Sequence, residues 1–125
     1  MANTIVWADI PVTDMDRARA FYGAVLQADI ALMDGTDGTV ALLPGGTDEV
    51  TGDLELSEGR RPSADGCTIY LNSNGDAAGM MARALAAGGE VLTPVTFMGE
   101  MIGSIGFFKD SEGNRIGVHQ ATTQA

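Results

Sequence analysis

The feature that most restricts the fold of this sequence is an internal repeat, in which two halves carry the same order of predicted elements 61 residues apart. Ile10 of the first half corresponds to Leu71 of the second, and Asp53 corresponds to Asn114. Residue identity between the halves is low, but each is predicted to run strand, helix, strand, strand, strand. Two such small sheets side by side make a curved trough that is suited to holding a ligand.

The predicted elements follow from hydrophobic periodicity and from helix-start signals. Residues 5–12 alternate between two faces, which is typical of a strand covered on one side. A Thr-x-x-acid signal at Thr13 precedes apolar residues at helical spacing and predicts a helix over residues 14–26. A second helix is predicted over residues 76–87, before two glycines. The remaining strands are predicted over residues 28–33, 40–43, 53–56, 67–73, 90–95, 102–109 and 115–119.

The length of 125 residues predicts one α+β domain made of two βαβββ modules. The modules are expected at residues 4–58 and 67–121, joined by a polar linker at residues 59–66. A chain of this length buries roughly two-thirds of its extended surface, which is enough for a core.

Charge and cysteine content exclude several function classes. Seven Lys and Arg against 17 Asp and Glu give a net charge of −10, which repels nucleic acid and anionic membranes. No apolar run reaches the roughly 20 residues of a membrane span, and no secretory signal precedes the first strand, so a cytoplasmic location is expected. One cysteine, Cys67, excludes an internal disulfide, and strand alternation predicts that it lies under the second helix.

Three segments resemble the vicinal oxygen chelate superfamily, which includes glyoxalase I, extradiol dioxygenases and bleomycin-resistance proteins. They are IVWADIPVTDMDRARAFYGAVL near the start, AAGGEVLTP in the second half, and FFKDSEGNRIGVHQ at the end. The resemblance covers essentially the whole chain. It implies two βαβββ modules forming a cupped, partly open β-barrel with the helices outside, and it implies a homodimer.

In metal-dependent members of that superfamily, four inward side chains bind one divalent ion, and they are usually His, Gln or Glu. The resemblance places Trp7, Leu56, Thr68 and Gly117 at these positions. Trp, Leu and Gly side chains do not coordinate such ions, and a lone threonine is a poor ligand. The sequence therefore predicts neither a metal site nor another cofactor.

The register of residues 53–56 stays open at this point. The offset of 61 residues places Leu56 in the trough, whereas strand alternation places Leu54 and Leu56 under the helix and Glu55 in the trough. A slip of one residue exchanges the two faces of a strand.

Three further residues lie two positions after a metal position and are therefore expected on the same strand face. They are Asp9 after Trp7, Tyr70 after Thr68 and His119 after Gly117. His119 is the only histidine and is a candidate general acid or base, with Asp9 fixing its tautomer. A histidine hydrogen-bonded at a strand end is the structural alternative.

The candidate ligand-binding residues are mostly apolar or aromatic. Trp7 is suited either to stacking on a planar ligand or to filling the space left by a missing metal. Tyr70 is expected on the same face as Thr68, as a core residue or as a ring that packs on a ligand. Met98 and Met101 lie in a loop that is expected to cap the trough, where methionine adapts to irregular apolar ligands. A surface loop or a dimer contact is the alternative for these methionines.

Three functions remain open. The first is a glyoxalase-like protein that binds a small organic molecule without a metal, either as a binding protein or as an enzyme using His119 with Asp9. The second is a metal-dependent lyase, isomerase or dioxygenase with an atypical ligand set of Asp9, Glu55 and His119. The third is an acidic drug-sequestering protein of the bleomycin-resistance type, which would attract a cationic drug.

Overall fold

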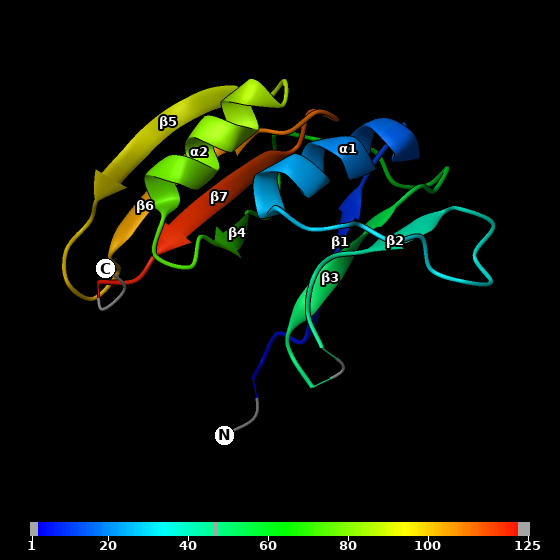
Figure 1. Ribbon diagram of the computed structural model, residues 1–125, viewed down its shortest axis with the longest axis horizontal. Coiled ribbons are helices and arrows are strands. Elements are labelled where there is room, and N and C mark those ends of the chain that lie inside the picture. The colour runs from blue at the N-terminus through cyan, green and yellow to red at the C-terminus, as the bar shows by residue number, and fades with distance from the viewer. Residues whose placement is uncertain (1–2, 47, 123–125) are drawn as a thin grey trace.

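The computed structural model describes residues 3–46 and 48–122, which form two mixed sheets and two helices (Figure 1). One sheet has the strand order β1-β3-β2, and the other has the order β4-β7-β6-β5. This is the predicted α+β glyoxalase-like fold, and the described strands do not close into a barrel. The elements are β1 (Trp7–Pro11), α1 (Met15–Leu26), β2 (Val40–Leu42), β3 (Thr51–Glu55), β4 (Ile69–Asn72), α2 (Ala77–Ala86), β5 (Glu90–Phe97), β6 (Ser104–Lys109) and β7 (Arg115–Gln120).

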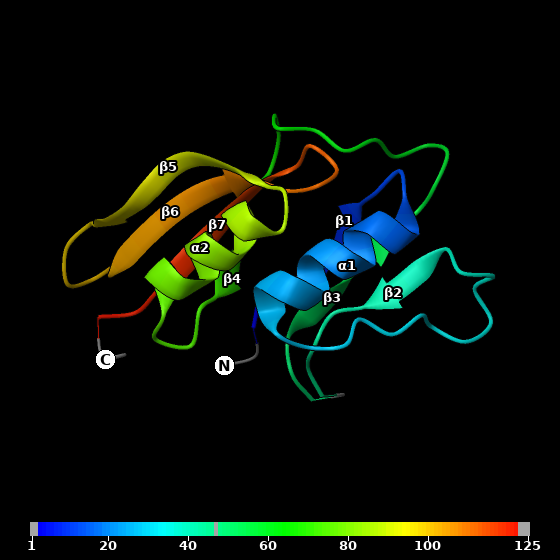
Figure 2. The same cartoon turned by 45° about the horizontal axis from the view of Figure 1, so that its top comes forward.

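Both helices lie on the same side of the sheets and contact each other (Figure 2). Ile10 of β1 and Leu54 of β3 are buried in the core that the sheets and helices share. Leu71 of β4 and Val118 of β7 join the same core from the second sheet. Because strand residues alternate in direction, the intervening residues face the opposite, uncovered side of the sheets.

Both helices begin at an aspartate cap. Asp14 caps α1, and its side chain accepts a hydrogen bond from the backbone N–H of Arg17 at 3.0 Å. The cap is therefore one residue after Thr13, where the start signal was predicted. Asp76 caps α2 in the same way by accepting from the N–H of Gly79 at 2.9 Å. These bonds satisfy backbone donors that have no partner within the helix.

Two sequence predictions about local structure are wrong. Residues 28–33 do not form a strand, because only Leu32 forms an isolated bridge, to Ala41, and only Ile30 in this segment is buried. Cys67 is exposed rather than covered by a helix. Strand β4 begins at Ile69, so alternation does not extend back to Cys67.

The strand pairing also corrects the repeat. Asp9 pairs with Asp53 in the parallel pair β1–β3, and Tyr70 pairs with Gly117 in the parallel pair β4–β7. Asp9 and Tyr70 correspond at the offset of 61 residues, so their strand partners, Asp53 and Gly117, correspond as well. The offset had instead matched Gly117 with Leu56, and it therefore does not hold for the last strand of each half. Leu54 is buried and Glu55 lies on the opposite face, as strand alternation predicted. Leu56 follows the end of β3 and is 38% exposed, so both its placement under the helix and its placement at a metal position are wrong.

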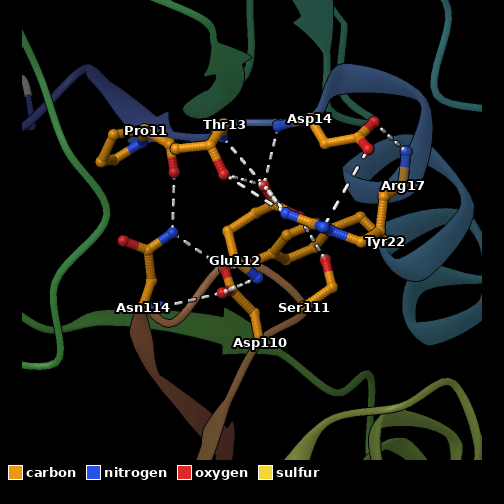
Figure 3. A network of polar contacts seen from close by, with 9 residues as sticks. All are labelled: Pro11, Thr13, Asp14, Arg17, Tyr22, Asp110, Ser111, Glu112 and Asn114. Atoms are coloured by element: carbon orange, nitrogen blue, oxygen red, sulfur yellow. Dashed lines mark hydrogen bonds and ion pairs between the residues drawn. The ribbon is translucent and has the colours of Figure 1, made fainter.

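The turn between β6 and β7 binds the two halves together through Glu112 (Figure 3). Its Oε1 accepts from the backbone N–H groups of Thr13 and Asp14 at 2.9 and 3.0 Å. The Nε of Arg17 donates to its Oε2 at 2.7 Å. Glu112 of the second half thus binds the N-terminal end of α1 in the first half, where a negative charge is favoured.

Two further hydrogen bonds continue this connection in Figure 3. The buried hydroxyl of Tyr22 donates to Asp110 Oδ2 at 2.5 Å. The Nδ2 of Asn114 donates to the carbonyl oxygen of Pro11 at 2.8 Å. Both bonds therefore join an element of the first half to the turn between β6 and β7 of the second half.

Candidate functional site

A cavity of about 610 Å³ lies between the two halves and is called the cleft below. Three residues predicted from the sequence to bind a ligand, Trp7, Thr68 and Tyr70, line it together. Its volume lies in the range of small-molecule sites. Much of the remaining wall is apolar and comes from both halves, including Ile5, Ile10, Leu26, Leu43, Val50, Ile69 and Leu71.

The two aromatic rings of the cleft are half exposed. Trp7 is 45% exposed and Tyr70 is 48% exposed. Tyr70 packs edge-on against Phe107, with ring centroids 5.7 Å apart. Arg115 lies over the ring of Phe107 and donates to Thr68 Oγ1 at 2.6 Å. The side chains on the second-half wall are therefore held by neighbours, while two aromatic rings remain open to a ligand.

Three carboxylates, Asp9, Asp53 and Glu55, share the uncovered face of β1 and β3, and we call them the acidic cluster. Arg60 Nη1 lies 2.9 Å from Asp9 Oδ2 and 3.1 Å from Glu55 Oε1. The second contact has the distance of an ion pair but not the alignment of a hydrogen bond. One guanidinium thus serves two carboxylates and leaves the third without a cation among the ion pairs of the described residues.

Asp53 is the carboxylate without that cation. It is only 7% exposed, and its Oδ2 accepts from Trp7 Nε1 at 3.1 Å. Its Oδ1 is buried and receives no N–H or O–H donor from the described residues, but the Asp53 carboxyl lies within hydrogen-bond reach of the Asp9 carboxyl, which it contacts when one of the two is protonated. Burial raises the pKa of Asp53 to about 6, and the bond from Trp7 opposes this shift. A hydrogen bond with the Asp9 carboxyl and the charges of Asp9 and Glu55 add to the rise.

The two residues predicted to be catalytic lie in different surroundings. His119 Nε2 lies 2.7 Å from the carbonyl oxygen of Ile102, whereas Asp9 pairs with Arg60. Asp9 lines a smaller cavity of about 220 Å³, and His119 lines neither this cavity nor the cleft. Within the described residues His119 and Asp9 thus make separate contacts and no hydrogen bond joins them, so their joint catalytic role stays a prediction.

The other predicted residues are spread over the molecule. Glu55 forms an ion pair with Arg60 and does not line the cleft. Met98 is 50% exposed and Met101 is 99% exposed in the loop between β5 and β6, and neither lines the cleft.

Sequence reasoning missed Asp53. The offset between the halves had paired it with Asn114, in a turn, and so removed it from the candidate face. The alternation of Asp53 with Leu54 and Glu55 was the signal that pointed to it, because a buried Leu54 requires both acids on the other face.

The comparisons with known proteins give the family. The model described as the Glyoxalase/Bleomycin resistance protein/Dioxygenase superfamily matches residues 4–118. The chain belongs to this superfamily. A comparison with curated proteins finds no match.

Solved structures of this superfamily share the fold. A glyoxalase/bleomycin resistance protein from Albidiferax ferrireducens T118 superimposes with a TM-score of 0.75 at 17% identity, covering 93% of this chain and 98% of that chain. A glyoxalase-related enzyme from Fulvimarina pelagi gives 0.72 at 15% identity, covering 94% and 88%. A superfamily member from Sphaerobacter thermophilus DSM 20745 gives 0.68 at 21% identity, covering 95% and 98%. At these identities the likeness shows the fold alone.

The metal site that the superfamily resemblance implies does not fit this chain. With the corrected register, its four positions hold Trp7, Asp53, Thr68 and Gly117, of which only Asp53 is a strong ligand. A Cβ added at Gly117 would collide with the ring of Tyr70, so this ring fills the space where a ligating side chain would begin.

The structure does not bring the alternative set of metal ligands together either. Over residues 3–46 and 48–122, no group of three or more His, Cys, Asp or Glu side chains is arranged to hold a metal ion. The atypical set of Asp9, Glu55 and His119 is therefore not assembled. In the same residues, no helix is long and apolar enough to cross a membrane.

Proposed function

We propose that this glyoxalase-superfamily protein binds a small, largely apolar organic molecule in the cleft, without a metal ion. The observation that carries the proposal is a cavity of about 610 Å³ with two half-exposed aromatic rings, Trp7 and Tyr70, on its walls. Exposed aromatic rings beside apolar walls favour a planar or aromatic ligand, because stacking adds to the burial of apolar surface.

Binding without a metal is supported by the donor set. Of the four corresponding positions, three hold Trp7, Thr68 and Gly117, and the Tyr70 ring packs where a side chain at Gly117 would extend. The ligand is therefore expected to be held by ring contacts and apolar walls rather than by bonds to a cation.

An enzymatic role using His119 with Asp9 remains a second proposal. It requires His119 to leave the carbonyl of Ile102 and a substrate to extend beyond the cleft, since His119 does not line it. Binding alone requires neither change, and for this reason the geometry favours binding as the primary function.

The single tryptophan makes the proposal testable, because Trp7 is the only indole fluorophore and lines the cleft. We expect 4-phenylbutanol, a neutral aromatic probe, to change the intensity of Trp7 emission saturably in buffer containing EDTA. The substitution Val50→Phe narrows the cleft and should weaken binding at least tenfold.

The control is Leu85→Phe, which adds a ring at a position 58% exposed on α2, away from the cleft. It should leave the affinity unchanged, and both variants should unfold in a cooperative transition. Equal affinity in the Val50→Phe variant and the wild type, or no response of Trp7 to the probe, would overturn the proposal.

A further inference from the structure

We infer that the smaller cavity is a subsite for a carboxylate, so that the molecule bound in the cleft is an organic acid with an apolar body. The inference rests on the proposed function and deepens it. Ile10 of β1 and Ile69 of β4 line both the cleft and the smaller cavity of about 220 Å³. The two cavities therefore adjoin at the first strands of the two halves, where one elongated molecule can reach both.

The first step is the position of Arg115, which lines the smaller cavity and contacts a residue of the cleft. Its Nη1 donates to Oγ1 of Thr68, which lines the cleft, at 2.6 Å, and its Cζ lies 3.8 Å from the centre of the Phe107 ring. These contacts hold the guanidinium in place. A guanidinium has five N–H donors in a planar fork, so donors remain for a ligand. A carboxylate fits that fork because it accepts two parallel hydrogen bonds.

The second step is another guanidinium in the same cavity. Arg61 lines the smaller cavity from the segment between β3 and β4, and it takes part in none of the ion pairs of residues 3–46 and 48–122. The segment is fixed to the second half, because the backbone N–H of Ser63 donates to Oδ1 of the buried Asn114 at 3.1 Å. The wall that carries Arg61 is therefore built into the fold rather than placed by chance.

The third step is the balance of charge in the smaller cavity. Its charged lining residues are Asp9, Arg61, Asp65 and Arg115. Asp9 is already matched by its ion pair with Arg60. Within the described residues, two guanidiniums without an ion pair are thus set against the single carboxylate of Asp65, which leaves one positive charge. A carboxylate matches that charge, whereas a phosphate group with a charge of about −2 exceeds it.

The test compares three probes of nearly equal size that differ in charge. These are 4-phenylbutyrate, 4-phenylbutanol and 4-phenylbutylamine, each titrated against Trp7 emission at pH 7.5 in 0.15 M salt. We expect the carboxylate to bind at least tenfold more tightly than the alcohol, and the amine to bind most weakly. The net charge of −10 attracts the amine and repels the carboxylate, so this order identifies a local site for an anion.

Two variants remove the guanidiniums one at a time. Arg61→Gln changes an exposed side chain and should reduce the preference for the carboxylate over the alcohol to threefold or less. Arg115→Gln should do the same, and the ratio of the two affinities corrects for any change in the cleft, because both probes use it. The matched control is Lys109→Gln, which removes one positive charge from β6 outside both cavities and should keep the full preference.

Cys67 provides a readout located in the smaller cavity, because it lines that cavity, is exposed and is the only cysteine of the chain. Saturating 4-phenylbutyrate should slow the alkylation of Cys67 by iodoacetamide at least threefold. Saturating 4-phenylbutanol should leave the rate unchanged, since the alcohol places no anion beside Arg61 and Arg115.

The outcomes separate this inference from the proposed function. Equal binding of carboxylate and alcohol, or saturation with the carboxylate that does not slow the alkylation of Cys67, would overturn the carboxylate subsite and leave the cleft as a ligand site. A preference for the carboxylate that survives both Arg61→Gln and Arg115→Gln would also overturn the subsite. If none of the three probes changes Trp7 emission, the proposed function is refuted and the subsite with it.

Discussion

Replacing Glu112 by glutamine tests whether this turn residue holds the two halves together. Burial opposes ionisation of Glu112, but hydrogen bonds from Arg17, Thr13, Asp14 and Ser111 outweigh it and lower its pKa to about 2. Relative to an ordinary value of 4.5, this corresponds to an upper limit of about 3.4 kcal/mol. Since the Arg17 side chain is 51% exposed, solvent screening reduces the expected loss to about 1–2 kcal/mol.

The pH dependence of this loss has a definite sign. The folded-state pKa lies below the unfolded value, so the contribution of Glu112 is fully present above about pH 4.5 and disappears as the pH falls toward 2. Glutamine keeps the shape of the side chain but not its charge. The free energy of unfolding should therefore differ between wild type and Glu112→Gln by about 1–2 kcal/mol at pH 7 and by almost nothing at pH 2.

Urea unfolding followed by circular dichroism at pH 7, 4 and 2 measures this difference directly. The control Glu58→Gln changes an exposed glutamate in the segment after β3 and should match the wild type throughout. Glu112 does not stabilise the folded protein as an ionised group if Glu112→Gln is as stable as the wild type at pH 7, or if the loss of stability is as large at pH 2 as at pH 7.

Three further predictions follow from the site and the family. Because the pKa of Asp53 is raised in the folded state, the stability of the wild type falls as the pH rises from 3.8 to about 6; Asp53→Asn should therefore raise the free energy of unfolding by about 1–3 kcal/mol above pH 6 and leave it unchanged below pH 3.8. Urea unfolding at pH 3.5 and 7.5 measures this difference, and a lower free energy of unfolding for the variant at pH 7.5 would contradict the prediction. His119→Ala should abolish any turnover found if His119 acts with Asp9, and unchanged turnover in a folded variant would remove that role. Light scattering should give twice the 12.9 kDa of one chain, as the superfamily resemblance predicts, and a monomer at micromolar concentration would contradict it.

Helices and strands with a strong hydrophobic periodicity and a clear start signal were predictable from the sequence. The helix at Met15–Leu26 and the strand at Trp7–Pro11 lie within one or two residues of their predicted bounds because one face of each is buried. Residues 28–33 carry apolar side chains as well, but only Ile30 reaches the core. Composition alone does not distinguish such a segment from a strand, because strand formation depends on partners elsewhere in the chain.

The candidate site was partly predictable for a similar reason. Trp7, Thr68 and Tyr70 lie on the first strand of each half or beside it, and the repeat brings those strands toward one cavity. The position of Asp53 depends on a register that the repeat offset misassigned and that only the burial of Leu54 decides.

Loop residues were the least predictable part of the site. No periodicity specifies where Met98 and Met101 point, and they lie in a loop away from the cleft. The same limit applies to Arg60, whose contact with the acidic cluster depends on the path of the segment after β3.

The most direct measurement for the account is the affinity of 4-phenylbutanol for the metal-free protein, followed through Trp7 emission. The titration is run after treatment with EDTA and again with saturating Mg²⁺, Mn²⁺, Ni²⁺ or Zn²⁺. We predict saturable binding in EDTA and the same dissociation constant with each metal. Binding that develops only after a divalent ion is added would contradict the account.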